Sequence, residues 1–484
     1  MREFFLVYDL PSFWWMNIIL AIAIIYMNRY RPARSTTLWL MIMALFPIVG
    51  FIPYLLLGRD TRRRRKFYEK NTMDMRIMEQ ALVDFDDIRR KQELDDAGRF
   101  QDYMELVAIN ARTGRTELSE GNRVQIFTDG RSKFDALIAD IDAATQEINL
   151  QYYILKSDAL GYELIHALMR AVSRGVHVRV LSDGIGVRSL SRRAQKEMRQ
   201  SGIEFGIFFP SVLRYINLRL NYRNHRKIVV IDNAIGYIGG FNVGDEYVGR
   251  SPRFGPWRDT HLRIEGLAVA SMKLRFLQDW YYVLGTDPAQ EPAFTPRRPE
   301  NGDVFCQLVS SGPDTALANI KFSMLKMISA ANKAIYIQTP YFIPDQSIYE
   351  ALVLAIQQGV EVNLMIPDRP DHPVVYPATM SFAGELIHAG AKVYRYERGF
   401  LHSKVLIIDD VASLVGSCNM DERSFSLNFE SSEFLLSPEV NAQLRAAFQK
   451  DIEFSTLLTP ELYQQRSLLM KLKEPVCRLF APLL

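Results

Sequence analysis

The sequence predicts an α/β protein built from two similar repeats and preceded by a hairpin of two membrane-spanning helices. Three observations support this prediction. Two long uncharged segments lie near the N-terminus, β-like and amphipathic helical runs alternate after Asn122, and an internal repeat runs through that alternation. The chain has 484 residues, which is enough for more than one hydrophobic core.

The two uncharged segments are Phe13 to Met27 and Thr36 to Leu57. The second reaches the roughly 20 residues that cross a bilayer, and the first does so when Tyr8 to Ser12 is included. The alternatives are a buried core helix or a cleaved signal peptide, whose basic start and small-residue cleavage site are missing here. Aromatic rings near the segment ends are typical of anchors at the headgroup layer: Trp14, Trp15, Tyr26 and Trp39.

Basic residues set the expected orientation of this hairpin. Arg29, Arg31 and Arg34 stand between the spans, and the heavier cluster, Arg59 and Arg62 to Lys66, follows the second span. The heavier cluster is expected on the cytoplasmic side, where it can also bind anionic lipid. We therefore expect a multi-pass membrane protein in which residues 1–66 form the hairpin and the remainder faces the cytoplasm. The charge-rich residues 67–121 are predicted to form a helical tether.

Composition excludes several function classes. Lys and Arg number 58 against 55 Asp and Glu, so the formal net charge is only +3. This balance argues against a protein that coats nucleic acid, and we expect no nucleic-acid partner. The 3 Cys residues are too widely spaced for a disulfide framework or a zinc motif, so no structural metal is expected.

The internal repeat defines two domains, residues 122–300 and residues 301–484 with a C-terminal tail. Ile148 to Ile154 corresponds to Ile335 to Ile343, and in each copy an apolar helix and a glycine-led strand follow. Each copy then carries the pattern His-x-Lys-x-x-x-x-Asp on an apolar strand. Its residues are His225, Lys227 and Asp232 in the first copy and His402, Lys404 and Asp409 in the second.

Side chains two apart on a strand point to the same face, so each His and Lys should share one site. Seven residues beyond each Asp, a glycine turn carries an Asn: Gly239-Gly240-Phe241-Asn242 and Gly416-Ser417-Cys418-Asn419. Backbone amides at glycine turns and Asn side chains can bind an anion. The expected phosphate-binding residues are Gly240, Asn242, Ser417 and Asn419.

The duplicated motif and its glycine turns resemble the phospholipase D superfamily, and together with the N-terminal spans they resemble the bacterial cardiolipin synthases. The resemblance covers nearly the whole chain. It implies two repeats packed face to face with both motif strands at their junction, and an inner-membrane enzyme that joins two phosphatidylglycerols into cardiolipin and glycerol. The first turn departs from the second, since Gly240 stands where the second turn has Ser417.

The resemblance also implies roles for the motif residues. One histidine forms a phosphatidyl-histidine and the other acts as acid and base, and by resemblance His225 is the nucleophile, although the residues alone do not separate the two. Taken alone, Asp232 and Asp409 would be interpreted as caps of their strand ends. Within the duplicated motif, the resemblance implies that they orient the histidines and stabilise their charge. The lysines neutralise phosphate, so neither a metal nor a cofactor is expected.

Alternatives remain open from the residues. Water in place of the lipid alcohol would give a phospholipase D-type hydrolase, and a nuclease or a non-catalytic scaffold fits less well. His261, Glu246 and Glu430 are either partners of the site or fold residues, while the remaining histidines are expected to be structural: His166, His177, His372 and His388. The insertion 208–223 before the first motif either touches the membrane or packs into the core. The sequence does not indicate an oligomeric state.

Overall fold

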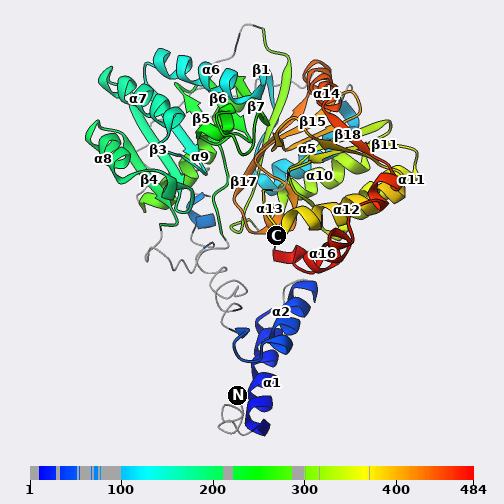
Figure 1. The fold of residues 1–484 in the computed structure, drawn as a ribbon. Helices are drawn as coiled ribbons and strands as arrows, with labels where there is room; N and C mark the ends of the chain where they lie inside the picture. Colours follow the sequence, from blue (N-terminus) through cyan, green and yellow to red (C-terminus); the bar gives the residue numbers. More distant parts are fainter. Residues whose placement is uncertain are drawn as a thin grey trace.

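The computed structural model describes residues 10–28, 33–51, 54, 67, 70–74, 77, 100–210, 222–285, 299, 301–315, 317–369 and 371–483. A two-lobed body of strands and helices stands on a narrow stalk formed by α1 (Leu10–Met27) and α2 (Ala33–Leu45) (Figure 1). Helix α1 forms the far part of the stalk, and the C-terminal helix α16 lies where the stalk meets the body.

The first lobe follows the predicted alternation of strands and helices. Its parallel strands β2, β3 and β4 are extended by the antiparallel strands β5, β6 and β7, and α6 and α7 cover one face while α9 covers the other. The elements are β1 (Ser119–Asp129), α6 (Gly130–Ala143), β2 (Glu147–Tyr152), α7 (Ala159–Ser173), β3 (His177–Asp183), α8 (Arg192–Gln200), β4 (Glu204–Phe208), β5 (Ile228–Ile231), β6 (Ile235–Gly239), β7 (Trp257–Glu265) and α9 (Ala268–Leu284).

The second lobe repeats this order. Strands β9, β11 and β12 are parallel, and β14, β15 and β17 continue the sheet in antiparallel fashion. Its elements are β8 (Val304–Ser311), α10 (Asn319–Ser329), β9 (Ala334–Gln338), β10 (Phe342–Ile343), α11 (Gln346–Gln357), β11 (Glu361–Pro367), α12 (Val375–Ala389), β12 (Lys392–Tyr396), β13 (Phe400–Leu401), β14 (Val405–Ile408), β15 (Ala412–Gly416), β16 (Met420–Asp421), α13 (Glu422–Ser426), β17 (Glu430–Leu436), α14 (Pro438–Ile452), β18 (Ser455–Leu458), α15 (Pro460–Gln464), α16 (Leu468–Leu479) and the short turn η7 (Ala481–Leu483).

The lobes are joined by strand pairing and by a shared core. The long strand β1 pairs with β7 of the first lobe and with β8 of the second, which links all but two short strands into one hydrogen-bonded order. A buried cluster contains Ile228 and Ile238 from the first lobe together with Val405 and Leu435 from the second. Alternate side chains of a strand point to the same face of the sheet, and here the apolar ones point towards the other lobe. The apolar faces of the two lobes therefore pack against each other at the junction.

Residues 100–118 differ from the expected tether. Helix α5 (Gln101–Gly114) buries Tyr103, Leu106 and Val107 in the core of the second lobe, against α10 and β8. The charged residues of α5 occupy the opposite, exposed face of the helix, whereas the charge-rich stretch that suggested a solvated helix, residues 84–91, lies outside the described residues. Helix α5 is therefore part of the folded body.

The stalk also differs in detail from the expected hairpin. Helix α2 ends at Leu45 and a turn around Pro47 follows, where Ile48 has a φ of 62°. Trp39 was expected to anchor at the headgroup layer, but it is buried beside Ile24 and packs edge-on against Tyr54 with ring centroids 5.4 Å apart. Among the residues that the structure describes, no helix combines the length and the apolar content needed to cross a membrane.

Two expected features fall largely or wholly outside the described residues: the basic stretch Arg62 to Lys66 and the centre of the insertion, residues 211–221. The described ends of the insertion are packed. Phe208 and Phe209 are buried in a cluster of aromatic side chains that includes Trp280 and Phe429. For these two residues the core alternative is the one observed.

Candidate active site

Each histidine motif is held by the backbone of the opposite lobe. The His225 amide donates to the carbonyl of Phe429 at 2.9 Å, and the His402 amide donates to the carbonyl of Arg258 at 2.7 Å. The hydroxyls of Ser403 and Thr260 are 2.7 Å apart across the same junction. Both motifs therefore enter one site where the lobes meet, and neither lobe forms that site alone.

The carboxylate beside each imidazole also comes from the opposite lobe. Nδ1 of His402 lies 2.6 Å from Oδ2 of Asp259, and Nδ1 of His225 lies 3.0 Å from Oε1 of Glu430. Such a contact fixes the proton on Nδ1 and leaves Nε2 free to react. The two histidines thus have equivalent partners in a crossed arrangement.

Asp232 and Asp409 do not have the expected role. Asp232 accepts hydrogen bonds of 2.7 to 2.9 Å from the backbone amides of residues 145–147, and Asp409 does the same for residues 332–334. Both have φ near 50° at the end of the motif strand, where the short Asp side chain turns back on the backbone. The expectation that they orient the histidines is corrected, since Asp259 and Glu430 hold those positions.

The glycine turns also serve the histidine partners. The Gly240 amide donates to the Thr260 carbonyl, and a Cβ at Gly240 would lie 1.9 Å from Oδ1 of Asp259. The Ser417 hydroxyl donates to Glu430 at 2.5 Å, and its amide donates to the Ser431 carbonyl. The sequence predicted that Gly240 and Ser417 bind phosphate. In the structure, these amide and hydroxyl groups donate to other protein groups instead.

The two Asn residues lie beside these turns with their amides already engaged. Oδ1 of Asn242 accepts from the Ile154 amide at 3.1 Å, and its nitrogen donates to the Tyr247 hydroxyl at 3.2 Å. Asn419 hydrogen-bonds to Asp421, and its Oδ1 has no hydrogen-bond partner within the described residues. Both side chains are buried.

The two lysines are buried and unusually easy to deprotonate. Burial lowers the pKa of Lys227 to about 7 and that of Lys404 to about 8. Nζ of Lys227 donates to the His225 carbonyl at 2.6 Å, and Nζ of Lys404 lies 2.7 Å from Nδ1 of His402. Each lysine also acts electrostatically on the other motif's histidine, which places all four groups within one field.

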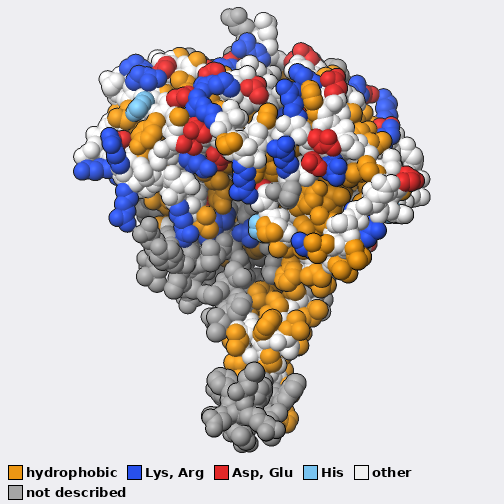
Figure 2. Space-filling view, viewed as in Figure 1, with side chains coloured by type: hydrophobic (Ala, Val, Ile, Leu, Met, Phe, Trp, Pro, Cys, Tyr) orange, Lys and Arg blue, Asp and Glu red, His pale blue; other side chains and the backbone are white. Residues whose placement is uncertain are grey.

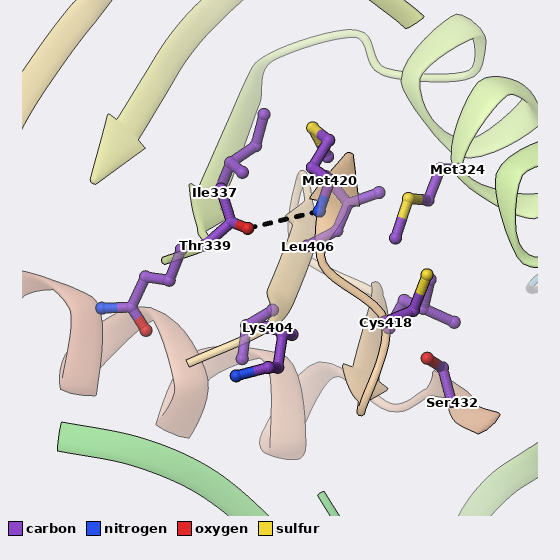
Figure 3. A pocket seen from close by; sticks show the side chains of 11 residues that line it. Met324, Ile337, Thr339, Lys404, Leu406, Cys418, Met420 and Ser432 are labelled. Carbon is purple, nitrogen blue, oxygen red and sulfur yellow. Dashed lines mark hydrogen bonds between the residues drawn. The ribbon is translucent and has the colours of Figure 1, made fainter. Parts of the chain in front are cut away.

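A small cavity lies beside the Lys404 side chain. Its walls include Met324, Ile337, Leu406 and Cys418, and the Lys404 amine points away from the Cys418 sulfur (Figure 3). Gln338, Thr339 and Ser432 add polar groups to the lining. The negative charges of Asp259 and Glu430 favour the ammonium form of Lys404, and a bound phosphate would act in the same direction.

Burial also favours neutral histidines. It lowers the pKa of His225, and together with the charge of Lys404 it lowers the pKa of His402 to about 3. Although burial alone raises the pKa of Glu430, its contact with His225 lowers that pKa overall. Without a bound anion, the site thus holds neutral imidazoles, charged carboxylates and two lysines whose charged form an anion would stabilise. This arrangement is suited to attack on a phosphodiester.

Asp259 is the site residue that the sequence prediction missed, because its neighbour His261 drew attention instead. Both ring nitrogens of His261 are buried without a hydrogen-bond partner in the described part of the chain, and the ring packs near Tyr237 and Phe241. Glu430 proves to be a partner of the site, whereas Glu246 pairs with Lys156 at 2.5 Å. A carboxylate near the start of the corresponding strand in each copy, Asp259 in β7 and Glu430 in β17, was the available signal.

Comparisons with known proteins agree with this geometry. A family model described as "Cardiolipin synthase, PLD-like domain" matches residues 137–251 and 324–452, and one described as "Phospholipase_D-nuclease N-terminal" matches residues 15–59. The chain is 44% identical over 481 residues to the major cardiolipin synthase ClsA of Bacillus subtilis, covering 98% of both chains. It is 45% identical over 478 residues to cardiolipin synthase 2 of Staphylococcus epidermidis, covering 98% of this chain and 97% of the relative.

Among solved structures, the chain is similar to a phosphatidylserine synthase from Haemophilus influenzae. The TM-score is 0.60 at 13% sequence identity, with 78% of this chain and 96% of that chain covered. This likeness concerns the fold, which is the two-repeat α/β arrangement that the sequence predicts. The chain belongs to the cardiolipin synthase family of phospholipase D-like proteins.

Proposed function

We propose that the chain transfers a phosphatidyl group from one phosphatidylglycerol to the free hydroxyl of another, giving cardiolipin and glycerol. The observation that carries this proposal is the crossed pairing of His225 with Glu430 and of His402 with Asp259. Two activated imidazoles at one junction are what a two-step displacement at phosphorus requires. The cardiolipin synthase relatives, similar over nearly the full chain, support the choice of lipid substrate.

In the first step, Nε2 of His225 attacks the phosphorus of the donor lipid. A phosphorus–nitrogen bond forms while the bond to the glycerol oxygen breaks. His402, which takes up a proton when the anionic phosphodiester binds, donates that proton to the glycerol oxygen. Glu430 keeps the Nδ1 proton of His225 in place, which directs the lone pair of Nε2 at phosphorus. The assignment of nucleophile and acid follows the family resemblance.

In the second step, a hydroxyl of the acceptor phosphatidylglycerol attacks the same phosphorus. His402 takes the proton of that hydroxyl, the phosphorus–nitrogen bond breaks and neutral His225 is restored. Asp259 stabilises the His402 imidazolium that donates its proton in the first step and is formed again in the second. Lys227 and Lys404 hold the non-bridging oxygens, with Asn242 and Asn419 beside them.

The proposed setting is a bacterial inner membrane, since the substrates are bilayer lipids. Residues 1–66 would form the two-helix membrane hairpin and the body would face the cytoplasm, an arrangement supported by the uncharged segments and the basic cluster that follows them. Side chains of α1 such as Ile18, Ile19 and Ile22 are exposed, and apolar atoms cover much of the described stalk (Figure 2). Such a surface favours lipid over water.

Incubation of the purified full chain with phosphatidylglycerol as the only lipid tests this function. Mass spectrometry is expected to detect cardiolipin and glycerol in equal amounts, whereas phosphatidic acid as the main product would instead identify a hydrolase. The His225→Ala variant, purified in the same way, is the control for contaminating activity.

A further inference from the structure

Helix α16 is attached to the body by a side on which polar groups are buried together with Cys477. Glu474 is only 3% exposed and accepts hydrogen bonds from Arg466 at 2.7 and 2.9 Å and from the Tyr463 hydroxyl at 3.2 Å. Arg478 donates to Glu385 at 2.9 Å and lies over the Phe382 ring of α12. A helix that buries its carboxylate in this way is fixed firmly in one rotation about its own axis.

The opposite side of α16 is apolar and exposed. Its residues recur at the three- and four-residue intervals that place side chains on one helix face. They are Leu468, Leu469, Leu472, Val476, Leu479 and the following Phe480, which are 37% to 72% exposed. A surface helix of a globular protein usually turns its apolar face towards the core and its polar face towards water. The large apolar side chains of α16 face outwards, so they lack the burial that their composition favours.

Charge and position indicate what covers this face. The exposed lysines Lys471 and Lys473 flank the apolar face on its two sides, where long stems can reach from an apolar layer to anionic headgroups. The turn η7, directly after α16, packs against α2 of the stalk. Apolar atoms extend without a break from this corner of the body onto the stalk (Figure 2).

We propose that α16 is an interfacial helix that lies in the headgroup region of an anionic bilayer and holds the body against the membrane from which its substrate comes. The proposal rests on the proposed function for its statement about substrate, but the helix contact itself is independent of catalysis. Apolar side chains at the acyl boundary, with lysines at the phosphates, give the attraction that such helices use.

Site-specific quenching tests the contact. Leu472 on α16 and Leu354 on α11 are 61% and 59% exposed, so they form a matched pair of labelling sites. The full-length variants Leu472→Cys and Leu354→Cys would carry an environment-sensitive fluorophore in vesicles of phosphatidylglycerol and phosphatidylcholine. The native cysteines Cys306, Cys418 and Cys477 are buried, and labelling of the unmodified chain measures their background.

We expect headgroup nitroxide lipids to quench the label at 472, and aqueous iodide to quench it about threefold less than the label at 354. Equal iodide quenching at the two sites would overturn the proposal. Protection from iodide without lipid quenching, growing with the number of chains per vesicle, would also overturn it, because a second copy of the chain would then cover the face.

An activity measurement tests the consequence. The triple variant Leu468→Ser, Leu472→Ser and Val476→Ser leaves the buried side of α16 intact, so its melting temperature should match that of the unmodified chain. Conversion of phosphatidylglycerol should fall on the order of tenfold in vesicles and remain unchanged in mixed detergent micelles. Equal rates in vesicles would overturn the proposal, whereas an inactive unmodified chain would contradict the proposed function and leave the quenching result valid.

Discussion

The Nδ1 atom of His402 lies 2.6 Å from the carboxylate of Asp259, a residue of the opposite lobe. His225 and Glu430 form the equivalent pair in the other direction. Because each histidine belongs to one repeat and its partner to the other, the active arrangement exists only in the duplicated chain. On this basis Asp259 and Glu430 are expected to affect the reaction, whereas Asp232 and Asp409 are expected to affect the stability of the fold.

Asp259→Asn should impair catalysis without weakening the fold. The NH2 group of an amide can face Nδ1 and favour the wrong tautomer of His402, and a neutral amide does not stabilise the imidazolium, so the rate of cardiolipin formation should fall by roughly 10²- to 10⁴-fold. Glu430→Gln should act in the same direction on His225. Initial rates from labelled phosphatidylglycerol, together with melting temperatures, check both variants, and a rate within twofold of the unmodified chain would contradict the pairing.

Asp232→Asn should have the opposite profile. Its carboxylate accepts three backbone amides at the end of the motif strand, so an amide side chain should lower the free energy of unfolding by about 1 to 3 kcal/mol. Asp409→Asn is the matched change in the second lobe. Denaturant unfolding measures the loss, and a stable but inactive Asp232→Asn enzyme would restore the catalytic role that the sequence suggested.

Gly240→Ala tests how closely the glycine turn fits its neighbour. A Cβ would lie 1.9 Å from Oδ1 of Asp259, so that carboxylate must move away from His402. The rate of transfer should fall about tenfold or more, and Ser417→Ala, which removes a hydroxyl donor to Glu430 without adding atoms, should cost less. The rates of cardiolipin formation by the two variants, measured under the same conditions, test this prediction. An unchanged rate for Gly240→Ala would show that the position of Asp259 is not critical.

The lysines make anion binding depend on pH. Lys227, with a pKa of about 7, is mostly neutral at pH 8, and a bound anion favours its charged form. Affinity should therefore fall as pH rises from 7 to 9, and binding of tungstate at pH 8 should take up about one proton more than it does in the Lys227→Met variant. Calorimetry in two buffers of different ionisation enthalpy measures this uptake; equal uptake by both proteins would contradict the assignment.

The sequence predicted the elements that are local and repeated. The motif strands, the parallel strands before them and the glycine turns follow from short patterns that occur twice, such as His225 to Asp232 and His402 to Asp409. Glu430 was named only as one of three possible partners and Asp259 was missed, because both carboxylates reach their histidine from the opposite lobe and no fixed spacing links them to it. The packing of α5 was missed for a related reason: its apolar side chains are matched by a surface more than a hundred residues away.

The unusual orientation of α16 shows a second limit. The pattern from Leu468 to Leu479 indicates an amphipathic helix, but a pattern does not say which face meets the body. Here the polar partners Arg466 and Tyr463 bind Glu474 and determine that choice. Only the three-dimensional contacts place the apolar face outside.

Trapping the covalent intermediate tests the central claim most directly. A phosphatidyl ester of p-nitrophenol has a leaving group that needs no proton, so the His402→Ala variant should release one equivalent of nitrophenol and then stop. Peptide mass spectrometry should then find a phosphatidyl group on His225. No adduct should form in the His225→Ala variant. An adduct on His402 in that variant would reverse the assigned roles, and absence of adduct and burst from both variants would contradict the two-step mechanism.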